Sequence, residues 1–470
     1  MKIIAALLCG SMSILQGCVL GPDRTPPKIS LQQQYSETSS KLSDNISGSP
    51  WWTAFNDIPL NSLIQKGASK NIDTQQALLR VDIAQSDVVA SGAGATPIVA
   101  ASGEYNAHGS RGSYAAVAPT QSVSAGLTVS WLLDFFGEYK RSQENAVDTL
   151  EAAQAGADVA KLAFISRLAL AYIDFRYYDA SIAIVRGNLR SRRDTLALTR
   201  FQLSVGAASK LDVVQAEGLV NSTLSTIPGL EIGRRRAVDR IATLLDLTAP
   251  AVLTEIESQS KQPTQTSAIS AGVPADLIRN RPDIRQAERQ LSAAVANIGV
   301  AEAQLYPRIV LGGSISPASI SAKGLSGVQT TWSFGPALSL PIFDGGRLNA
   351  NVEKAQSNAR LAYLNWKGVV LTAVEEVENG LTGVIRDRES VAAFTRTVES
   401  YRQAVKLATE SYKDGGTSIL DLLDAERSVS NAQQDLAAAI KQSAQDYVIL
   451  NIALGGGYNA VAVAKQEEDK

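Results

Sequence analysis

The chain contains few of the side chains from which catalytic and metal sites are built. Its 470 residues include one histidine, two cysteines and two methionines, Met1 and Met12. His108 and the cysteines form no HExxH or CxxC pattern, so a zinc site lacks a set of ligands. A nucleophile beside a base and a phosphate-cradling glycine motif are absent too. The sequence therefore predicts a protein that is not an enzyme and has no metal or other cofactor apart from a covalent lipid.

An excess of charge of one sign is also lacking. Lysine and arginine number 44 and aspartate and glutamate 46, which gives a net charge of -2. Because no basic stretch is present to hold a phosphate backbone, nucleic acid is excluded as a partner. His108 lies in the polar stretch 104–112, which we expect to be a loop that exposes an ordinary histidine. The scarcity of methionine is a weak argument against copper export.

The first residues have the order of a secretory signal. Lys2 precedes an apolar run, 3–9, and a second apolar patch leads into Gly17 and Cys18. The apolar part is shorter than the roughly 20 residues that a transmembrane helix needs. We therefore expect residues 1–17 to be a signal peptide that is cleaved before Cys18.

Leu15-Gln16-Gly17-Cys18 resembles the lipobox of bacterial lipoproteins. The resemblance implies that Cys18 carries the membrane anchor, a diacylglycerol and an N-acyl chain such as palmitate. Once Cys9 is removed and Cys18 is acylated, no free thiol remains, which suits an oxidising periplasm. By resemblance to enterobacterial sorting rules, Val19 favours the outer membrane. An ordinary signal with an incidental cysteine is the alternative.

Residues 18–50 are predicted to form a lipidated, extended tether. They are rich in proline, serine and glutamine and contain few aromatic side chains. Trp51, Trp52 and Phe55 then mark the start of folded structure.

The rest of the chain contains an internal repeat: one sequence pattern occurs twice, at a spacing of about 210 residues. Three landmarks recur in the same order: Asp73-Thr-Gln-Gln-Ala77 and Asp283-Ile-Arg-Gln-Ala287, Phe135-Phe-Gly137 and Phe343-Asp-Gly345, and the segments 206–217 and 415–426. The predicted parts are a first repeat, 51–249, a connecting segment, 250–273, a second repeat, 274–457, and a flexible tail, 458–470.

Each repeat is predicted to contain a helix, two strands, a very long helix, a tight turn and a further helix. Alternation of apolar and polar residues predicts strands at about 97–106, 121–134, 307–316 and 329–343. The proline-free segments 137–202 and 347–414 follow the strand pairs, and as helices they would be about 100 Å long. Helices of that length are expected to pack side by side as a wall.

The strand count predicts how many chains assemble. A membrane sheet must close so that no edge exposes unpaired amides to hydrocarbon. Four strands per chain are too few, because membrane barrels begin near eight strands. A barrel of eight is filled by side chains. We therefore expect a homotrimer with a 12-stranded transmembrane barrel, in a fold that is otherwise mainly α.

Four motifs then carry a resemblance to a known family: Arg281-Pro-Asp-Ile-Arg-Gln-Ala-Glu288, Ala296-Asn-Ile-Gly-Val-Ala301, Leu305-Tyr-Pro307 and Leu340-Pro-Ile-Phe-Asp-Gly-Gly-Arg347. Together they resemble the TolC-like outer-membrane efflux proteins of the NodT/OprM-like lipoprotein branch, and the resemblance covers essentially the whole chain. It implies a trimeric barrel continuous with a helical periplasmic tunnel, docked to a periplasmic adaptor and an inner-membrane transporter, often of the RND class. The implied activity is passive conduction of drugs or other small toxic compounds out of the cell.

Two matched turns at the far ends of the long helices are predicted to form the periplasmic tip. Val205-Gly-Ala-Ala-Ser209 and Asp414-Gly-Gly-Thr-Ser418 reverse the chain, and Gly206, Gly415 and Gly416 suit the left-handed conformation of a helix reversal. By resemblance, these turns contact the adaptor. The candidate contact residues are Val205, Gly206, Ser209, Gly415, Gly416, Thr417 and Ser418. A purely structural role for the glycines is the alternative.

Two carboxylates beside the second tip are candidates for a gate. Asp421 and Asp424 are three residues apart, so they face one side of a helix, and in a trimer they would ring the tunnel mouth. Asp421 also fits a capping box with Ser418, so both interpretations remain open for it. Gln215 occupies the position of Asp424 in the first repeat. We therefore expect the second repeat to supply the constriction.

Two other functions remain compatible with this pattern. The same channel would serve as the outer component of a type I protein secretion system, although the lipoprotein signal and the motif set favour small-molecule efflux. A structural periplasmic coiled-coil lipoprotein without a pore would explain the helices but not the strands.

Overall fold

The computed structural model describes residues 19–32, 35–36, 50–111, 116–257, 261–265, 280–322 and 325–460. The expected signal peptide and the acylation site Cys18 lie outside these residues. The chain forms two compact units. The first comprises Met1–Lys28, Arg80–Gln154 and Gln286–Lys367, and the second Ile29–Leu79, Ala155–Arg285 and Gly368–Lys470.

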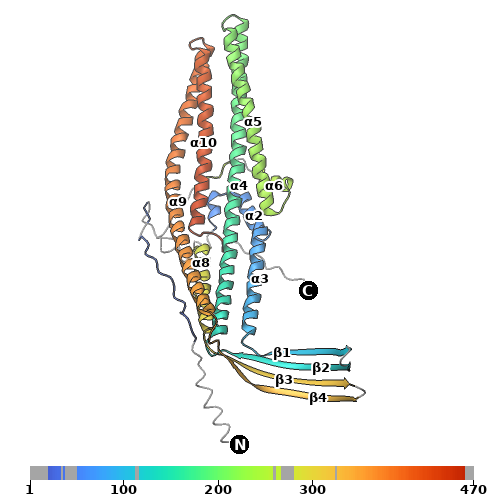
Figure 1. Ribbon diagram of the computed structural model, residues 1–470. Helices are drawn as coiled ribbons and strands as arrows, with labels where there is room; N and C mark the ends of the chain where they lie inside the picture. Colours follow the sequence, from blue (N-terminus) through green and yellow to red (C-terminus); the bar gives the residue numbers. More distant parts are fainter. Residues whose placement is uncertain are drawn as a thin grey trace. The chain divides into compact units, whose positions relative to one another are not determined.

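The first unit contains a four-stranded antiparallel sheet (Figure 1). Its strands are β1 (Ile98–Arg111), β2 (Ala116–Leu133), β3 (Arg308–Ala322) and β4 (Leu325–Ser339), in that spatial order. β2 of the first repeat pairs with β3 of the second, so the repeats share one sheet. The mainly helical fold with four strands per chain, built from two repeats, is as the sequence predicts.

β1 extends further than its pattern indicates. The strand continues to Arg111, and His108, expected in a loop, lies opposite Thr120 of β2. The expectation of a loop at 104–112 is therefore wrong for residues 104–111. The polar residues there continue the strand because the ladder to β2 satisfies their backbone groups. The His108 side chain is exposed, as expected.

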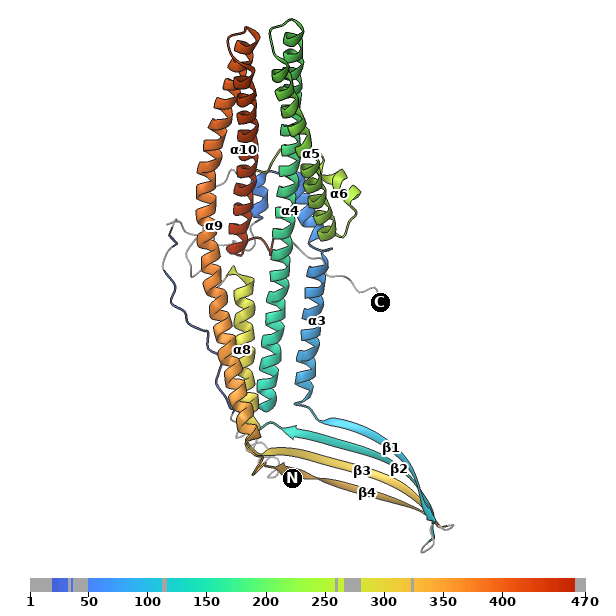
Figure 2. The same cartoon turned by 45° about the horizontal axis from the view of Figure 1, so that its top comes forward.

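The two longest helices are α4 (Glu138–Ser204) and α9 (Arg347–Lys413), each of 67 residues. The other helices are η1 (Trp51–Phe55), α2 (Ile58–Gly67), α3 (Ile72–Ala93), α5 (Lys210–Leu245), α6 (Ala249–Ile256), α8 (Pro282–Ala303) and α10 (Ile419–Ala453). In the first unit the helices lie side by side, with α9 at one flank and α3 at the other (Figures 1 and 2). None of the described helices is both long enough and apolar enough to cross a membrane.

The second unit has an aromatic cluster where folded structure was predicted to begin. Trp51, Trp52 and Phe55 are buried, and Tyr447 of α10 packs edge-on against Phe55 with ring centroids 5.3 Å apart. The predicted tail begins later than residue 458, because Tyr458 is buried and its hydroxyl lies 3.2 Å from the guanidinium of Arg285.

Candidate functional site

One face of the sheet is apolar and exposed. Residues that are partners in the strand register share a face, as Val99, Val129 and Phe334 do. Trp332 and Phe334 are 78% and 76% exposed, which is unusual for side chains of this size. The other exposed apolar residues of this face are Tyr105, Val123, Leu127, Ile315, Val328 and Leu338.

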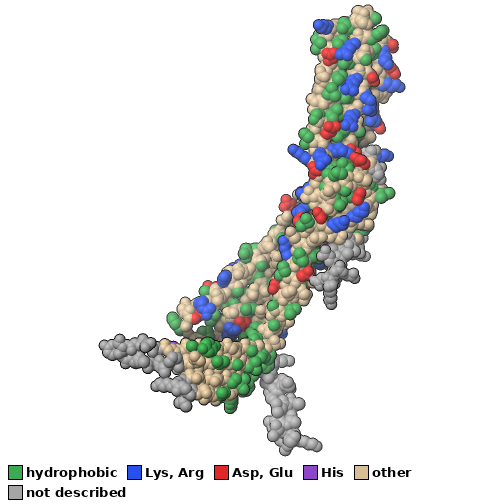
Figure 3. Space-filling view, turned by 90° about the vertical axis from the view of Figure 1, so that its right-hand side faces the viewer, with side chains coloured by type: hydrophobic (Ala, Val, Ile, Leu, Met, Phe, Trp, Pro, Cys, Tyr) green, Lys and Arg blue, Asp and Glu red, His purple; other side chains and the backbone are tan. Residues whose placement is uncertain are grey.

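The opposite face carries mainly small and polar side chains, with Ile98 and Ile320 as its large exposed apolar residues. Ser314 and Ser333 are hydrogen-bonded across β3 and β4 at 2.9 Å. This face also carries Ser122, Ser124, Thr128, Ser130, Ser316, Gln329 and Thr331. Figure 3 shows mostly green and tan atoms over the sheet, whereas blue and red side chains are frequent along the helices. Such a sheet suits hydrocarbon on one side and water on the other.

Both outer edges of the sheet are open within the chain. β1 pairs only with β2, and β4 only with β3, among the strands of the described residues. Each edge therefore presents a row of backbone N–H and C=O groups without a strand partner.

The two helix tips have the same local geometry. At the first tip, the N–H of Ala207 donates to the carbonyl of Gln202, and the N–H of Gly206 donates to the carbonyl of Leu203. Together these two bonds form a Schellman motif, in which Gly206 has a φ of 75°. The second tip repeats it with Gly416 donating to Ser411, Gly415 donating to Tyr412 and a φ of 76° at Gly415. Gly416 is not left-handed, so that expectation is wrong for this residue. A Cβ there would lie 2.9 Å from Ser411 Oγ, which is the end of a rotatable side chain.

Asp421 caps the helix that leaves the second tip. Its carboxylate accepts hydrogen bonds from the Thr417 and Ser418 hydroxyls, each at 2.8 Å, and from the Ser418 N–H at 3.2 Å. These bonds lower the pKa of Asp421. Ser418 accepts from the N–H of Asp421 in return, and Ser209 forms the same box with Asp212. The capping role is confirmed, whereas a role of Asp421 in gating stays a prediction.

Asp424 has a different environment. Its side chain is 74% exposed, and its nearest cation, Arg427, lies 3.7 Å away on the same helix. It borders a groove of about 490 Å³ between α5 and α10, and Gln215 lines the same groove. The two residues that occupy one position in the repeats therefore face one space.

The tips differ in polarity, which the repeat pattern did not predict. Beside the first tip, Phe201, Val205 and Leu211 are 64%, 61% and 64% exposed. The second tip instead carries Lys413 and Asp414, with Leu420 as an exposed apolar side chain. Exposed apolar residues at 201 and 211 are the signal that would have identified the first tip as an apolar surface.

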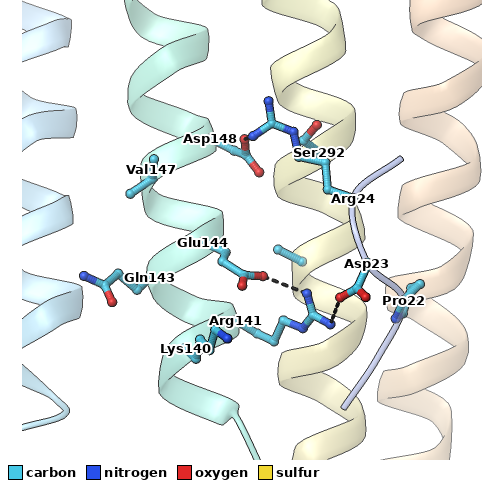
Figure 4. A pocket seen from close by; sticks show the side chains of 11 residues that line it. Pro22, Asp23, Arg24, Lys140, Arg141, Gln143, Glu144, Val147, Asp148 and Ser292 are labelled. Atoms are coloured by element: carbon cyan, nitrogen blue, oxygen red, sulfur yellow. Dashed lines mark hydrogen bonds and ion pairs between the residues drawn. The ribbon is translucent and has the colours of Figure 1, made fainter. Parts of the chain in front are cut away.

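The sequence did not predict that the residues after Cys18 would pack against helices; we call the surface of α4 and α8 that holds them the seat. Residues 19–28 are extended, as predicted for a tether, but they pack on α4 and α8 (Figure 4). The buried guanidinium of Arg141 donates to the carbonyls of Leu20 and Gly21 at 2.9 and 3.0 Å, and to the Asp23 carboxylate at 2.9 Å. Gly21 has a φ of 84° and lies so close to Gly299 that a Cβ would be 2.4 Å from the Gly299 Cα.

A second ion pair continues this seat. Arg24 donates to Asp148 at 2.8 Å, and the Asp148 side chain is 5% exposed. Burial raises the pKa of Asp148 to about 6, although the charge of Arg24 opposes the shift. Arg24, Arg141 and Asp148 line a cavity of about 500 Å³ (Figure 4).

Comparison with known proteins gives consistent matches. Residues 63–246 and 273–456 match the family described as outer membrane efflux protein. Nodulation protein T of Rhizobium leguminosarum bv. viciae is 48% identical, over 97% of this chain and 94% of that protein. Cation efflux system protein CusC of Escherichia coli O6:H1 is 30% identical, over 94% of this chain and 96% of that protein. The structure of the outer-membrane channel OprN has a TM-score of 0.82 at 29% identity, and the match covers 94% of this chain and all of that one.

Proposed function

Because this chain belongs to the outer membrane efflux protein family, we propose that it is the channel subunit of a tripartite pump that exports small toxic compounds. In this proposal the chain forms a lipid-anchored homotrimer in the outer membrane. A periplasmic adaptor and an inner-membrane transporter of the RND class deliver the cargo, and the channel conducts it passively. The relatives include proteins named for cations, antibiotics and solvents, so small compounds are the cargo that these names have in common.

The observation that carries the proposal is the one-sided sheet with two open edges. An apolar face with exposed Trp332 and Phe334 is stable in lipid only if the sheet closes and leaves no unpaired edge. Three copies supply twelve strands, which is the next multiple of four above a barrel of eight, whose interior is filled by side chains. The Ser- and Thr-rich face then lines the water-filled lumen.

The flanking helices support the same closure. α3 leads into β1 and α9 follows β4, so pairing β4 with β1 of a neighbouring copy brings α9 of one copy to α3 of the next. Ile83 and Val89 of α3 are 62% and 67% exposed, and Leu361 and Leu364 of α9 are 66% and 56% exposed. Burial of each such side chain contributes about 1.5–3 kcal/mol. These exposed apolar side chains are therefore suited to cover each other.

The remaining parts have roles that follow from this arrangement. Acylated Cys18 would place its lipid in the outer membrane next to the seat that begins at Val19. The tips would contact the adaptor, with the apolar residues beside the first tip supplying most of the buried area. The carboxylates of Asp421 and Asp424 would ring the periplasmic mouth.

Disulfide crosslinking tests the assembly, because no cysteine other than Cys18 would remain after signal cleavage. Ile83 lies about 15 Å from the end of α3 and Leu361 about 21 Å from the start of α9, so the two would meet at a similar depth. The double variant Ile83→Cys, Leu361→Cys should give crosslinked dimers and trimers in outer-membrane fractions. Phe201→Cys with Leu361→Cys is the control and should give none.

Function is tested by conductance and by drug sensitivity. The purified trimer should conduct ions in planar bilayers, and a deletion strain should become sensitive to dyes, detergents or antibiotics. A crosslinked trimer that never conducts would support a structural lipoprotein instead. A deletion strain that keeps its resistance but no longer secretes a protein would indicate type I secretion.

A further inference from the structure

A groove lined by amide side chains lies between α8 and α9, which run beside each other (Figures 1 and 2). We call it the amide groove, and its volume is about 280 Å³. Its polar lining consists of Asn297 and Gln304 of α8 and of Asn351, Lys354 and Asn358 of α9. None of the described residues that line it is acidic.

The amides of this groove have few partners within the protein. Gln304 donates to the carboxylate of Glu138 at 3.3 Å. The side chains of Asn297, Asn351 and Asn358 are exposed and make no hydrogen bond among the described residues. Each carboxamide has two N–H donors and an acceptor oxygen. The groove therefore offers three side chains that are available both to donate and to accept hydrogen bonds.

The asparagines of α9 recur at a spacing that keeps them on one face of the helix. Asn351, Asn358 and Asn365 are seven residues apart, and all three are exposed. Asparagine is a poorer helix former than alanine, glutamate or lysine, so helix stability does not favour it there. When α4 and α9 are aligned at their first residues, the first repeat has Ser142 and Thr149 at the first two of these positions. The row of asparagines is thus particular to the second repeat.

The amide groove faces the interior of the proposed trimer. The segment 19–28 follows the lipid anchor, so the helix faces that it covers are the outer ones. Val295 of α8 and Tyr363 of α9 line a cavity together with residues 24–28 of this segment. Because each residue advances about 100° around a helix, Gln304 points about 180° away from Val295, and Asn358 about 140° away from Tyr363. The groove therefore lies on the opposite face, which borders the water-filled tunnel.

The lining of the groove favours uncharged compounds that carry many hydroxyl groups. A hydroxyl group both donates and accepts a hydrogen bond, as a carboxamide does, so neighbouring hydroxyls of a carbohydrate match neighbouring amides. A cation would meet no carboxylate among the lining residues and would be repelled by Lys354. An anion would find one ammonium group, which is exposed and strongly hydrated.

We propose that the amide groove is a cargo-binding surface in the tunnel, and that it takes uncharged polyhydroxylated compounds such as short carbohydrates. The inference rests on the proposed function as a channel and adds a chemical class of cargo to it. Because the groove is open to water, each hydrogen bond to cargo replaces one to water, and binding is weak enough for the cargo to move on.

Binding of maltoheptaose, an uncharged oligosaccharide, tests the groove. Saturation-transfer NMR detects weak binding to the solubilised trimer whether or not the channel conducts, provided that the detergent has no sugar headgroup. Loss of one hydrogen bond weakens binding about fivefold, so Asn297→Ala with Asn358→Ala should raise the Kd about 25-fold. Thr149→Ala, at the equivalent position of the first repeat, is the matched control and should leave the Kd unchanged.

A second variant serves if the alanine variant does not assemble. Asn351→Ser with Asn358→Thr copies the first repeat, in which the Thr149 hydroxyl donates to the carbonyl of Asn145 in its own helix at 2.8 Å. A hydroxyl held in this way is less available to cargo, so this variant should also bind maltoheptaose more weakly. In planar bilayers, the sugar should interrupt the current through the parent trimer more often than through either variant.

Four results would overturn the inference in distinguishable ways. Absence of binding, or a Kd that is unchanged in both asparagine variants, would show that the sugar does not use the groove. Loss of binding in Lys354→Met but not in the asparagine variants would indicate an anion site. Displacement of the sugar by the polyamine spermine would indicate a cation site. A trimer that binds the sugar through these asparagines but never conducts would refute the proposed function and, with it, the role in cargo transport.

Discussion

Replacement of Arg141 by methionine should free the segment that follows the lipid anchor. The Arg141 side chain is 4% exposed, and it donates to the carbonyls of Leu20 and Gly21. A hydrogen bond from a charged group contributes about 1.5–3 kcal/mol, so these two bonds sum to about 3 kcal/mol or more. The bonds to Asp23 and Glu144 add little, because those carboxylates are 91% and 39% exposed.

Trypsin provides the assay, because it cleaves after arginine. A loss of about 3 kcal/mol raises the population of the released segment about 100-fold, since each 1.4 kcal/mol is a factor of ten. Cleavage after Arg24 in folded trimers should accelerate by the same factor if opening is fast relative to cleavage. The exposed neighbour Lys140, replaced by methionine, is the control. An unchanged cleavage rate in Arg141→Met would refute the assignment of Arg141 as the residue that holds this segment.

Three further predictions concern the gate, pH and the membrane face. The double variant Asp421→Ala, Asp424→Ala should raise single-channel conductance in planar bilayers, and an unchanged conductance would count against the gate. Because burial raises the pKa of Asp148 from 3.8 to about 6, the folded state binds the proton more tightly, so this residue makes the free energy of unfolding decrease as pH rises through that range. Denaturation of the Asp148→Asn variant should lack this contribution. Phe334→Lys should weaken trimer assembly in outer-membrane fractions by about 2–4 kcal/mol if the side chain faces the middle of the bilayer, whereas Ser333→Lys on the opposite face should be tolerated.

The sequence predicted those features that depend on neighbours along the chain. The capping box of Ser209 and the left-handed Gly206 follow from residues within one turn of the helix reversal. The alternation in β2 and the two 67-residue helices are likewise local patterns. Their repetition in the second half of the chain then gave the number of strands, and the strand count indicated an assembly of several copies.

Features that depend on contacts between distant residues were not predictable in this way. His108 belongs to a strand because β2 continues beside it. The buried side chain of Arg141 is covered in part by residues 20–23, which lie more than a hundred positions away in the chain.

What the sequence alone determined is therefore the repeated unit, its strands and helices, and the family that carries them. Only the tertiary structure decided that Glu217 is exposed and Glu426 is buried, although both occupy one position of the repeat. The physical reason is that burial and pKa depend on which helix packs against a side chain. In α10 that helix is α4 of the other repeat, which the sequence of α10 does not specify.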